Sequence, residues 1–407
     1  MEEFATYRNP QRQILINFYS NFLKAVDTNF SSSEVKENKL EEPVNIEGPV
    51  NFIYLKGDPG DGVQRKVLLL GDIHSPEIAY PPNSSINIAN FCRYVSQRTP
   101  QIIDIFIESF YEGPQPSFSL PQEEEQGKYL SNLIFTFRNC LRRNKSLCDE
   151  PMRIHYIDTR YLIKGIELFS LFLIESFLRN VLDPVNIFET GLWDLIIWPY
   201  DNEIENIARL TIEDARLTDI KLLSIDSSIR QKFKDIIITP IIQKITAFYR
   251  DTSHRDLFEQ AKQIRQKAIE TKTEISIQEY VIVSELKTRI IILKSDLLDA
   301  YFVYRLLKRA TNRKAELPKI ALKPGEPTTH VIGYMGAAHT FGIRDMLYKL
   351  GFNILGKEDA SNIEITDKNK QLRENVVQCL SYDSIRKSVD DFCTEKSLSK
   401  NMENLEI

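Results

Sequence analysis

The sequence has few of the residues that build several familiar kinds of site. Its five cysteines form no Cys-x-x-Cys pair, which argues against a zinc knuckle or a disulfide framework and fits a reducing compartment. It has only 15 glycines and contains no Walker loop, Gly-x-Gly-x-x-Gly, His-Glu-x-x-His or Gly-x-Ser-x-Gly motif. These absences argue against the common nucleotide-binding loops, zinc-protease helices and serine nucleophile elbows.

The chain also lacks a basic stripe and a long uncharged apolar run. The 52 Lys and Arg residues are spread throughout and the formal net charge is −5, so we expect no nucleic-acid partner. The most apolar helix-like segment, Tyr161–Leu182, carries Lys164, Glu167, Glu175 and Arg179, which favours a buried or amphipathic helix over a membrane span. The N-terminus does not have the pattern of a secretory signal, so we expect a cytoplasmic protein.

Short apolar runs alternate with helical patterns between residues 50 and 160. The expected strands are Asn51–Lys56, Lys66–Leu70, Ile102–Ile107 and Met152–Ile157, and the expected helices are Ser84–Arg98 and Glu123–Arg143. The stretch GDPGDGVQR is rich in turn residues, so the first two strands should form a hairpin. Such alternation is typical of βαβ units and a mainly parallel sheet.

The rest of the chain divides around this pattern. Residues 1–49 are predicted to be an N-terminal helix and a polar linker, 50–160 the first half of the core, and 161–315 a helical insertion. Residues 316–357 form the second half of the core, with strand His330–Tyr334, helix Thr340–Lys349 and strand Phe352–Leu355. Residues 358–407 hold a helix, Lys370–Cys393, and a tail. We therefore predict an α/β fold in which helices flank a mainly parallel β-sheet and a long helical insertion separates the two halves of the core.

Two copies of Gly-x-x-His stand out, Gly71–His74 and Gly336–His339, and each follows an apolar strand. With 15 glycines and 5 histidines in 407 residues, fewer than one copy is expected by chance. Glycine lets the backbone turn sharply at a strand exit, and ligands of parallel sheets bind at this edge. The two copies therefore predict one site built from both halves of the core.

Other polar residues follow neighbouring strands. Glu108 ends the strand Ile102–Ile107, while Asp158 and Arg160 follow Met152–Ile157. Two imidazoles and a carboxylate can activate a water or hold a divalent metal such as Mn, Co, Zn or Fe. An arginine could stabilise an oxyanion, although Asp158 and Arg160 could equally form a local salt bridge.

These positions resemble a superfamily that includes the TraB/PrgY proteins, the Tiki proteases, the erythromycin esterases and the ChaN-like proteins. Its pattern is a first Gly-x-x-His, a Glu after the next strand, and a late Gly-x-x-His followed by Gly. Here those are Gly71–His74, Glu108, Gly336–His339 and Gly342. Asp72 departs from the small or hydroxyl residue expected after the first glycine.

The resemblance implies an α/β core and a His74, Glu108 and His339 site, used in different branches for metal-dependent proteolysis, ester hydrolysis or haem binding. We expect a hydrolase of small-molecule or peptide substrates. The alternatives are a binding protein that holds a metal, haem or small ligand without catalysis, and an inactive scaffold of the same fold, for example from a large DNA virus. Oligomeric state, substrate and metal stay open.

Simpler structural roles compete with these interpretations. His74 and His339 could each cap a helix or bond a loop, and Asp72 could be a loop or capping residue. Among the other histidines, His155 is expected to be a satisfied histidine of the sheet and His330 a structural residue at a strand start. His254 is expected to be exposed between helices.

Overall fold

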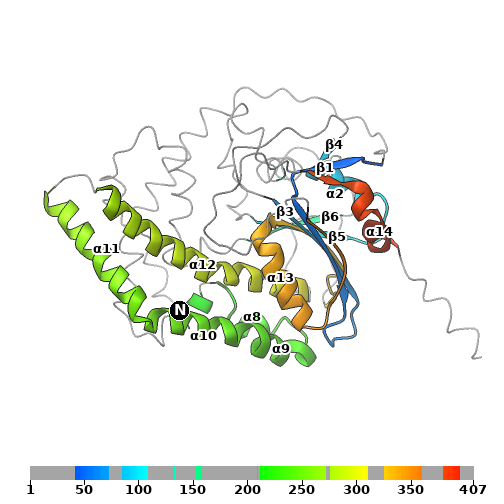
Figure 1. The fold of residues 1–407 in the computed structure, drawn as a ribbon. Coiled ribbons are helices and arrows are strands. Elements are labelled where there is room, and N and C mark those ends of the chain that lie inside the picture. Colours follow the sequence, from blue (N-terminus) through cyan, green and yellow to red (C-terminus); the bar gives the residue numbers. More distant parts are fainter. Residues whose placement is uncertain are drawn as a thin grey trace, which may run out of the picture.

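The computed structural model describes residues 42–72, 85–108, 133, 152–157, 209, 211–213, 215–271, 276–309, 325–359 and 379–394 (Figure 1). A six-stranded sheet in the order β6-β5-β7-β3-β2-β8 lies at its centre, beside a three-stranded sheet in the order β4-β1-β9. The strands are β1 (Asn45–Glu47), β2 (Asn51–Gly57), β3 (Arg65–Asp72), β4 (Ser85–Asn87), β5 (Ile103–Ile107), β6 (Met152–Tyr156), β7 (His330–Gly336), β8 (Asn353–Asp359) and β9 (Cys379–Ser381).

In the described parts of the chain, helices separate and follow these strands. They are α2 (Ile88–Ser96), α8 (Asp219–Leu222), α9 (Ser227–Phe233), the π-helical turn η5 (Lys234–Ile238), α10 (Thr239–Arg250), α11 (Thr252–Thr271), α12 (Ile277–Leu307), α13 (Ala337–Lys349) and α14 (Tyr382–Cys393). All of the described helices between β6 and β7 belong to the segment that the sequence predicts to be helical. In Figure 1, α11 and the first part of α12 extend away from the sheet.

The pairing confirms the predicted fold class. Strands β3, β5, β6 and β7 form parallel pairs, whereas β2 runs antiparallel to both of its neighbours, β3 and β8. The predicted hairpin is therefore β2–β3. The chain leaves β7 through α13 and returns as β8, with β3 and β2 between the two strands. The molecule is an α/β protein with a mainly parallel sheet flanked by helices.

Both faces of the inner strands β2, β3, β5 and β7 are buried, as expected for a sheet that is covered by helices on both sides. On one face, side chains such as Leu69, Phe106 and Met335 pack with α12, α13 and the helices before them. On the other face, Leu70 and Ile105 belong to a second apolar cluster with α2 and α14. Alternate residues of each strand thus serve two cores, and the fold has three layers (Figure 1).

Several local predictions differ from the structure. The region predicted as a polar linker contains strand β1, and the predicted C-terminal helix contains strand β9, because these two short segments pair with each other across the chain. Helix α2 begins after Asn87, whose side chain accepts the Asn90 amide at 2.9 Å, so the helix starts later than the predicted Ser84. Helix α13 begins at Ala337, three residues earlier than predicted. The predicted N-terminal helix and the segment Tyr161–Leu182 lie outside the described residues.

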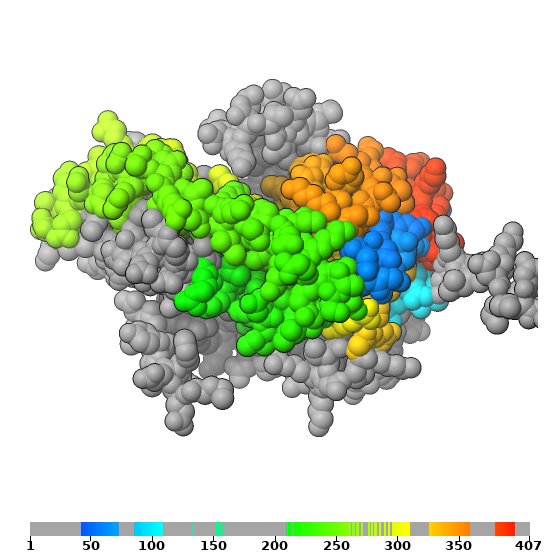
Figure 2. Space-filling model, turned by 90° about the horizontal axis from the view of Figure 1, so that it is seen from below, coloured from blue at the N-terminus to red at the C-terminus, as the bar shows by residue number. Residues whose placement is uncertain are grey.

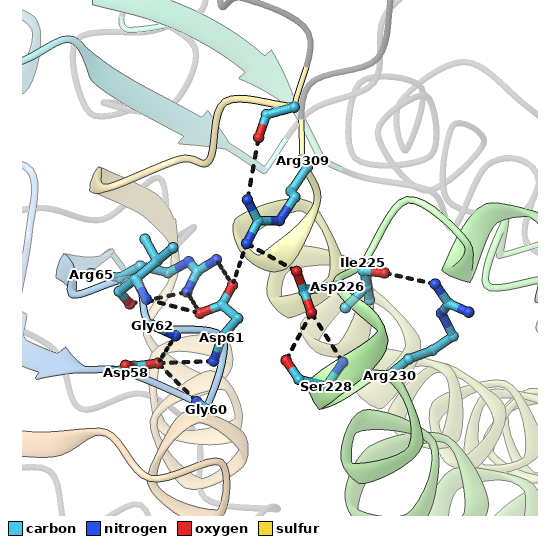
Figure 3. Close-up of polar contacts among 12 residues, drawn as sticks. Asp58, Gly60, Asp61, Gly62, Arg65, Ile225, Asp226, Ser228, Arg230 and Arg309 are labelled. Atoms are coloured by element: carbon cyan, nitrogen blue, oxygen red, sulfur yellow. Dashed lines mark hydrogen bonds and ion pairs between the residues drawn. The ribbon is translucent and has the colours of Figure 1, made fainter.

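The turn between β2 and β3 is held by its own polar residues (Figure 3). Asp58 Oδ1 accepts the backbone amides of Gly60, Asp61 and Gly62 at 2.8–3.1 Å. Gly60 and Gly62 have φ values of 117° and 74°, a conformation that glycine adopts without strain. The turn residues of the sequence therefore act here through a carboxylate cap and two left-handed glycines.

The same turn contains a buried ion pair and is approached by an arginine from the helical segment (Figure 3). Arg65 binds both carboxylate oxygens of Asp61 at 2.7 Å, and neither side chain is exposed to solvent. Arg309, just after α12, reaches Asp226 at 3.0 Å and approaches Asp61 at 3.9 Å. Burial alone would raise the pKa of Asp61, but the hydrogen bond and charge of Arg65 outweigh it and lower that pKa.

Viewed from below, the blue β2–β3 segment abuts the green helices α8–α10 on one side and the orange α13–β8 region on the other (Figure 2). This packing places the turn at the end of β3 opposite to Gly71. Within the described part of the chain, none of the helices combines the length and the apolar character needed to cross a bilayer.

Candidate functional site

The predicted site lies where three neighbouring parallel strands end. β7 lies between β5 and β3, so Glu108, Gly336 and Gly71 follow or end adjacent strands at the same edge of the sheet. In the register, Asp72 pairs with Gly336, and the Glu108 amide donates to the Tyr334 carbonyl at 3.1 Å. The two Gly-x-x-His motifs are thus juxtaposed at their glycines, although they are 265 positions apart (Gly71 and Gly336) in the sequence.

Glu108 binds the start of α13. Its Oε2 accepts the Gly336 amide at 2.6 Å, and its side chain is almost completely buried. α13 has no acidic residue in its first turn and no side-chain hydrogen bond at its cap. A carboxylate is favoured at a helix N-terminus by the free amides and the helix dipole. Glu108 supplies that carboxylate from another strand, and its second oxygen is turned toward His339.

His339 lies in the first turn of α13 between two carboxylates. Its Nδ1 is 2.6 Å from Asp299 Oδ1, a hydrogen-bonding distance, and its Nε2 is 3.5 Å from Glu108 Oε1. Asp299 comes from α12, so three elements meet at one imidazole: β5, α12 and α13. All three side chains are at least nine-tenths buried. The sequence-predicted pair Glu108 and His339 is brought together.

A neutral imidazole cannot donate a hydrogen bond to both of these carboxylates. A neutral ring carries one N–H, and the short contact assigns it to Nδ1, which donates to Asp299. Nε2 then presents a lone pair toward Glu108 Oε1, and a proton or a cation near both atoms relieves the repulsion. Burial raises the pKa of the Asp299 carboxyl. His339 opposes this rise, whereas the negative charges of Asp296 and Glu108 add to it.

The spacing of these two atoms also suits a shared metal ion. Ligand atoms about 2.1 Å from a tetrahedral metal lie about 3.4 Å from each other. His339 Nε2 and Glu108 Oε1 are 3.5 Å apart, and imidazole plus carboxylate is a donor set that Zn, Mn and Fe accept. In the described part of the chain, no group of three or more His, Cys, Asp or Glu side chains could hold a metal. The described residues therefore fit two ligands of such a site.

Two glycines are required by close approaches around His339. A Cβ atom on Gly71 would lie 2.3 Å from Asn51 Oδ1 and 2.6 Å from the Cα of Ala337, so the bare backbone lets the start of α13 pack against the end of β3. A Cβ atom on Gly342 would lie 2.0 Å from Asp299 Oδ2. Gly342 is one turn after His339, and its missing side chain leaves the space that the Asp299 carboxylate fills.

The remaining predicted site residues lie outside the described residues. They are His74, Asp158 and Arg160. The structure does describe Asp72, which is buried at the end of β3. It therefore joins Glu108, Gly71, Gly336 and His339 around one edge of the sheet, and the predicted His74, Glu108 and His339 metal set stays a prediction.

Asp299 is not among the residues that the sequence predicts for the site. Its signal is an isolated acidic residue inside the apolar run LLDAYFVY, where the neighbouring residues of α12 are buried. Charged side chains are rarely buried without a partner, so such a residue indicates a polar contact. Nothing in the local sequence says that this partner is His339, which is 40 residues away.

The other histidines have structural surroundings. His155 bonds through both nitrogens, to Asp104 at 2.5 Å and to Arg305 at 2.8 Å, which confirms a satisfied sheet histidine. His330 bonds Thr329 at 3.1 Å, and burial lowers its pKa to about 4. His254, at the start of α11, stacks on the ring of Phe248 in α10 and is only partly exposed. The expectation of an exposed residue is therefore wrong.

Comparisons of this chain with protein-family models, curated proteins and solved structures gave no match. The resemblance to the superfamily with paired Gly-x-x-His motifs thus stays a prediction from those motifs.

Proposed function

We propose that this chain is a hydrolase of ester or peptide bonds whose reaction centre is formed by Glu108, His339 and Asp299. The supporting observation is the arrangement of two carboxylates on opposite nitrogens of one buried imidazole, at the carboxyl ends of β5 and β7. Ligands of parallel sheets bind at this edge. A carboxylate that orients a histidine is a recurrent element of hydrolytic sites.

Each residue has a defined role in this proposal. Asp299 accepts a hydrogen bond from the Nδ1–H of His339, so Nε2 is the basic atom. The same bond keeps the imidazole from rotating freely. A water placed within hydrogen-bonding reach of Nε2 and Glu108 Oε1 would lose a proton to His339 as it attacks a carbonyl carbon. Asp299 stabilises the resulting imidazolium, which then protonates the leaving oxygen or nitrogen. The Gly336 amide keeps Glu108 in place.

A divalent cation is compatible with the same atoms. Glu108 Oε1 and His339 Nε2 would hold it, and further ligands would come from residues outside those described, with His74 as the predicted one. When bound, such a cation lowers the pKa of a coordinated water toward neutrality. In that form of the site, Asp299 keeps the role of orienting the ligand histidine.

The test is an assay of full-length protein on a panel of ester and peptide substrates, with and without Mn, Co or Zn. His339→Ala, Glu108→Gln and Asp299→Asn should each lower kcat/KM, by about 100-fold or more for His339→Ala. His254→Gln, which alters a histidine on α11 outside the site, is the matched control and should match the wild type. Turnover that is equal in His339→Ala and wild-type protein, or no turnover on any substrate, would refute the proposal.

A further inference from the structure

α12 contacts the sheet through a second polar anchor besides Asp299. Near the end of this helix, Arg305 Nη2 lies 2.8 Å from His155 Nδ1 on β6. His155 Nε2 lies 2.5 Å from Asp104 Oδ1 on β5, and Asp104 is fully buried. Arg153 Nε also donates to Asp104, at 2.7 Å. A continuous hydrogen-bonded chain therefore connects two strands of the sheet to α12.

The hydrogen-bond partners of His155 determine which of its ring nitrogens carries the proton. A guanidinium can only donate, so Nδ1 must accept from Arg305. The proton of the neutral ring is then on Nε2, which donates to Asp104. Burial lowers the pKa of His155, with Arg305 and Arg153 adding to the effect and Asp104 opposing it, which favours the neutral ring. Both nitrogens are used, so His155 is not a base or a metal ligand. His339 has the opposite tautomer.

Between these two anchors, the surface of α12 that faces the sheet is apolar. Phe302 lies between Asp299 and Arg305 on α12 and meets the Phe106 ring edge to face at 5.0 Å. It also covers Gly333 of β7, where a Cβ would lie 2.8 Å from the Phe302 ring. Apolar contacts of this kind are not directional, whereas hydrogen bonds specify an angle and a distance.

The position of Asp299 depends on that rotation. A side-chain atom of a helix lies about 6 Å from the helix axis, so a rotation of about 20° moves it by about 2 Å. A displacement of that size would break the 2.6 Å bond between Asp299 and His339.

We propose that Asp104, His155 and Arg305 are positioning residues that set the rotation of α12 and so hold Asp299 against His339. The proposal rests on the proposed function for its effect on turnover, but its structural part can be measured without a substrate. His155→Leu removes both hydrogen bonds. His155→Gln keeps one donor and one acceptor on the side chain and serves as the conservative variant.

The experiment records the imidazole nitrogen and Nδ1–H signals of His339 in full-length protein labelled with 15N-histidine, where only five histidines contribute. Wild type and His155→Gln should show a strongly deshielded Nδ1–H that Asp299→Asn shifts. His155→Leu should lose or shift it, and kcat should fall about 10- to 100-fold with little change in KM. Arg98→Met, which removes an ion pair on the opposite face of the sheet, is the control and should leave the His339 signals unchanged.

The outcomes separate the two proposals. His155→Leu could lower the melting temperature as Arg98→Met does and yet leave the His339 signals as in wild type. In that case the hydrogen bonds of Asp104, His155 and Arg305 only stabilise the fold, and the inference is wrong. If the signals change as expected but no substrate is turned over by wild-type protein, the positioning inference stands and the proposed function fails. Arg305→Met, which removes the donor to His155 Nδ1, gives a second test if His155→Leu does not fold, and it should shift the His339 signals as His155→Leu does.

Discussion

Gly342→Ala tests the contact between α12 and α13 without any knowledge of a substrate. The added Cβ would lie 2.0 Å from Asp299 Oδ2, whereas ordinary van der Waals contact begins near 3.4 Å, so the carboxylate must move by about 1.4 Å. Overpacking of a buried site costs about 1–3 kcal/mol. Alanine in place of glycine within a helix stabilises by about 1 kcal/mol. We expect a net loss of up to about 2 kcal/mol.

The sign of the effect should reverse when Asp299 is truncated. In an Asp299→Ala background the carboxylate is gone, so Gly342→Ala should stabilise the protein by about 0.5–1 kcal/mol through helix propensity alone. Urea unfolding of the wild type, the two single variants and the double variant completes the cycle. Gly342→Ala could instead stabilise the protein equally in both backgrounds. That result would show that Asp299 does not lie over Gly342, and the described packing of α12 on α13 would be wrong.

Two further predictions concern buried groups away from the site. Asp61→Asn leaves the guanidinium of Arg65 buried without its counter-ion and should cost about 3–5 kcal/mol in urea unfolding, and a loss below 1 kcal/mol would contradict the buried pair. His330 has a folded pKa of about 4, below its ordinary 6.5, so the unfolded chain binds more protons between these values. Its contribution of about 3 kcal/mol to the free energy of unfolding is present above pH 6.5 and is lost as the pH falls toward 4. His330→Phe should flatten this part of the profile of stability against pH. An unchanged profile would refute the assignment.

Much of the fold follows from local patterns. The apolar runs around Leu68, Ile105 and Ile332 are bounded by turn residues, so the strands can be placed from the sequence alone. The paired Gly-x-x-His motifs indicate which strand ends meet, because glycine at a strand exit next to a histidine is rare in this chain. These signals depend only on residues near each other in sequence.

The parts that could not be predicted depend on distant partners. The start of α13 carries no cap of its own, and its amide at Gly336 is bound by Glu108, 228 residues earlier, so no local signal marks the true helix start. Asp299 is recognisable as an unusual charge in a buried helix, but its partner is set by how α12 packs on α13. Strands β1 and β9 are three residues long and are stabilised by pairing between distant segments, because β1 pairs with both β9 and β4.

In the proposed hydrolysis, Asp299 and His339 act as one unit. The most direct test is a double-mutant cycle of kcat/KM with Asp299→Asn, His339→Ala and the double variant, on a substrate that the wild type turns over. We predict that the double variant is no slower than His339→Ala, because Asp299 acts only through the imidazole. If Asp299→Asn lowers kcat/KM by the same factor with and without His339, the two residues act independently. That result would contradict the claim.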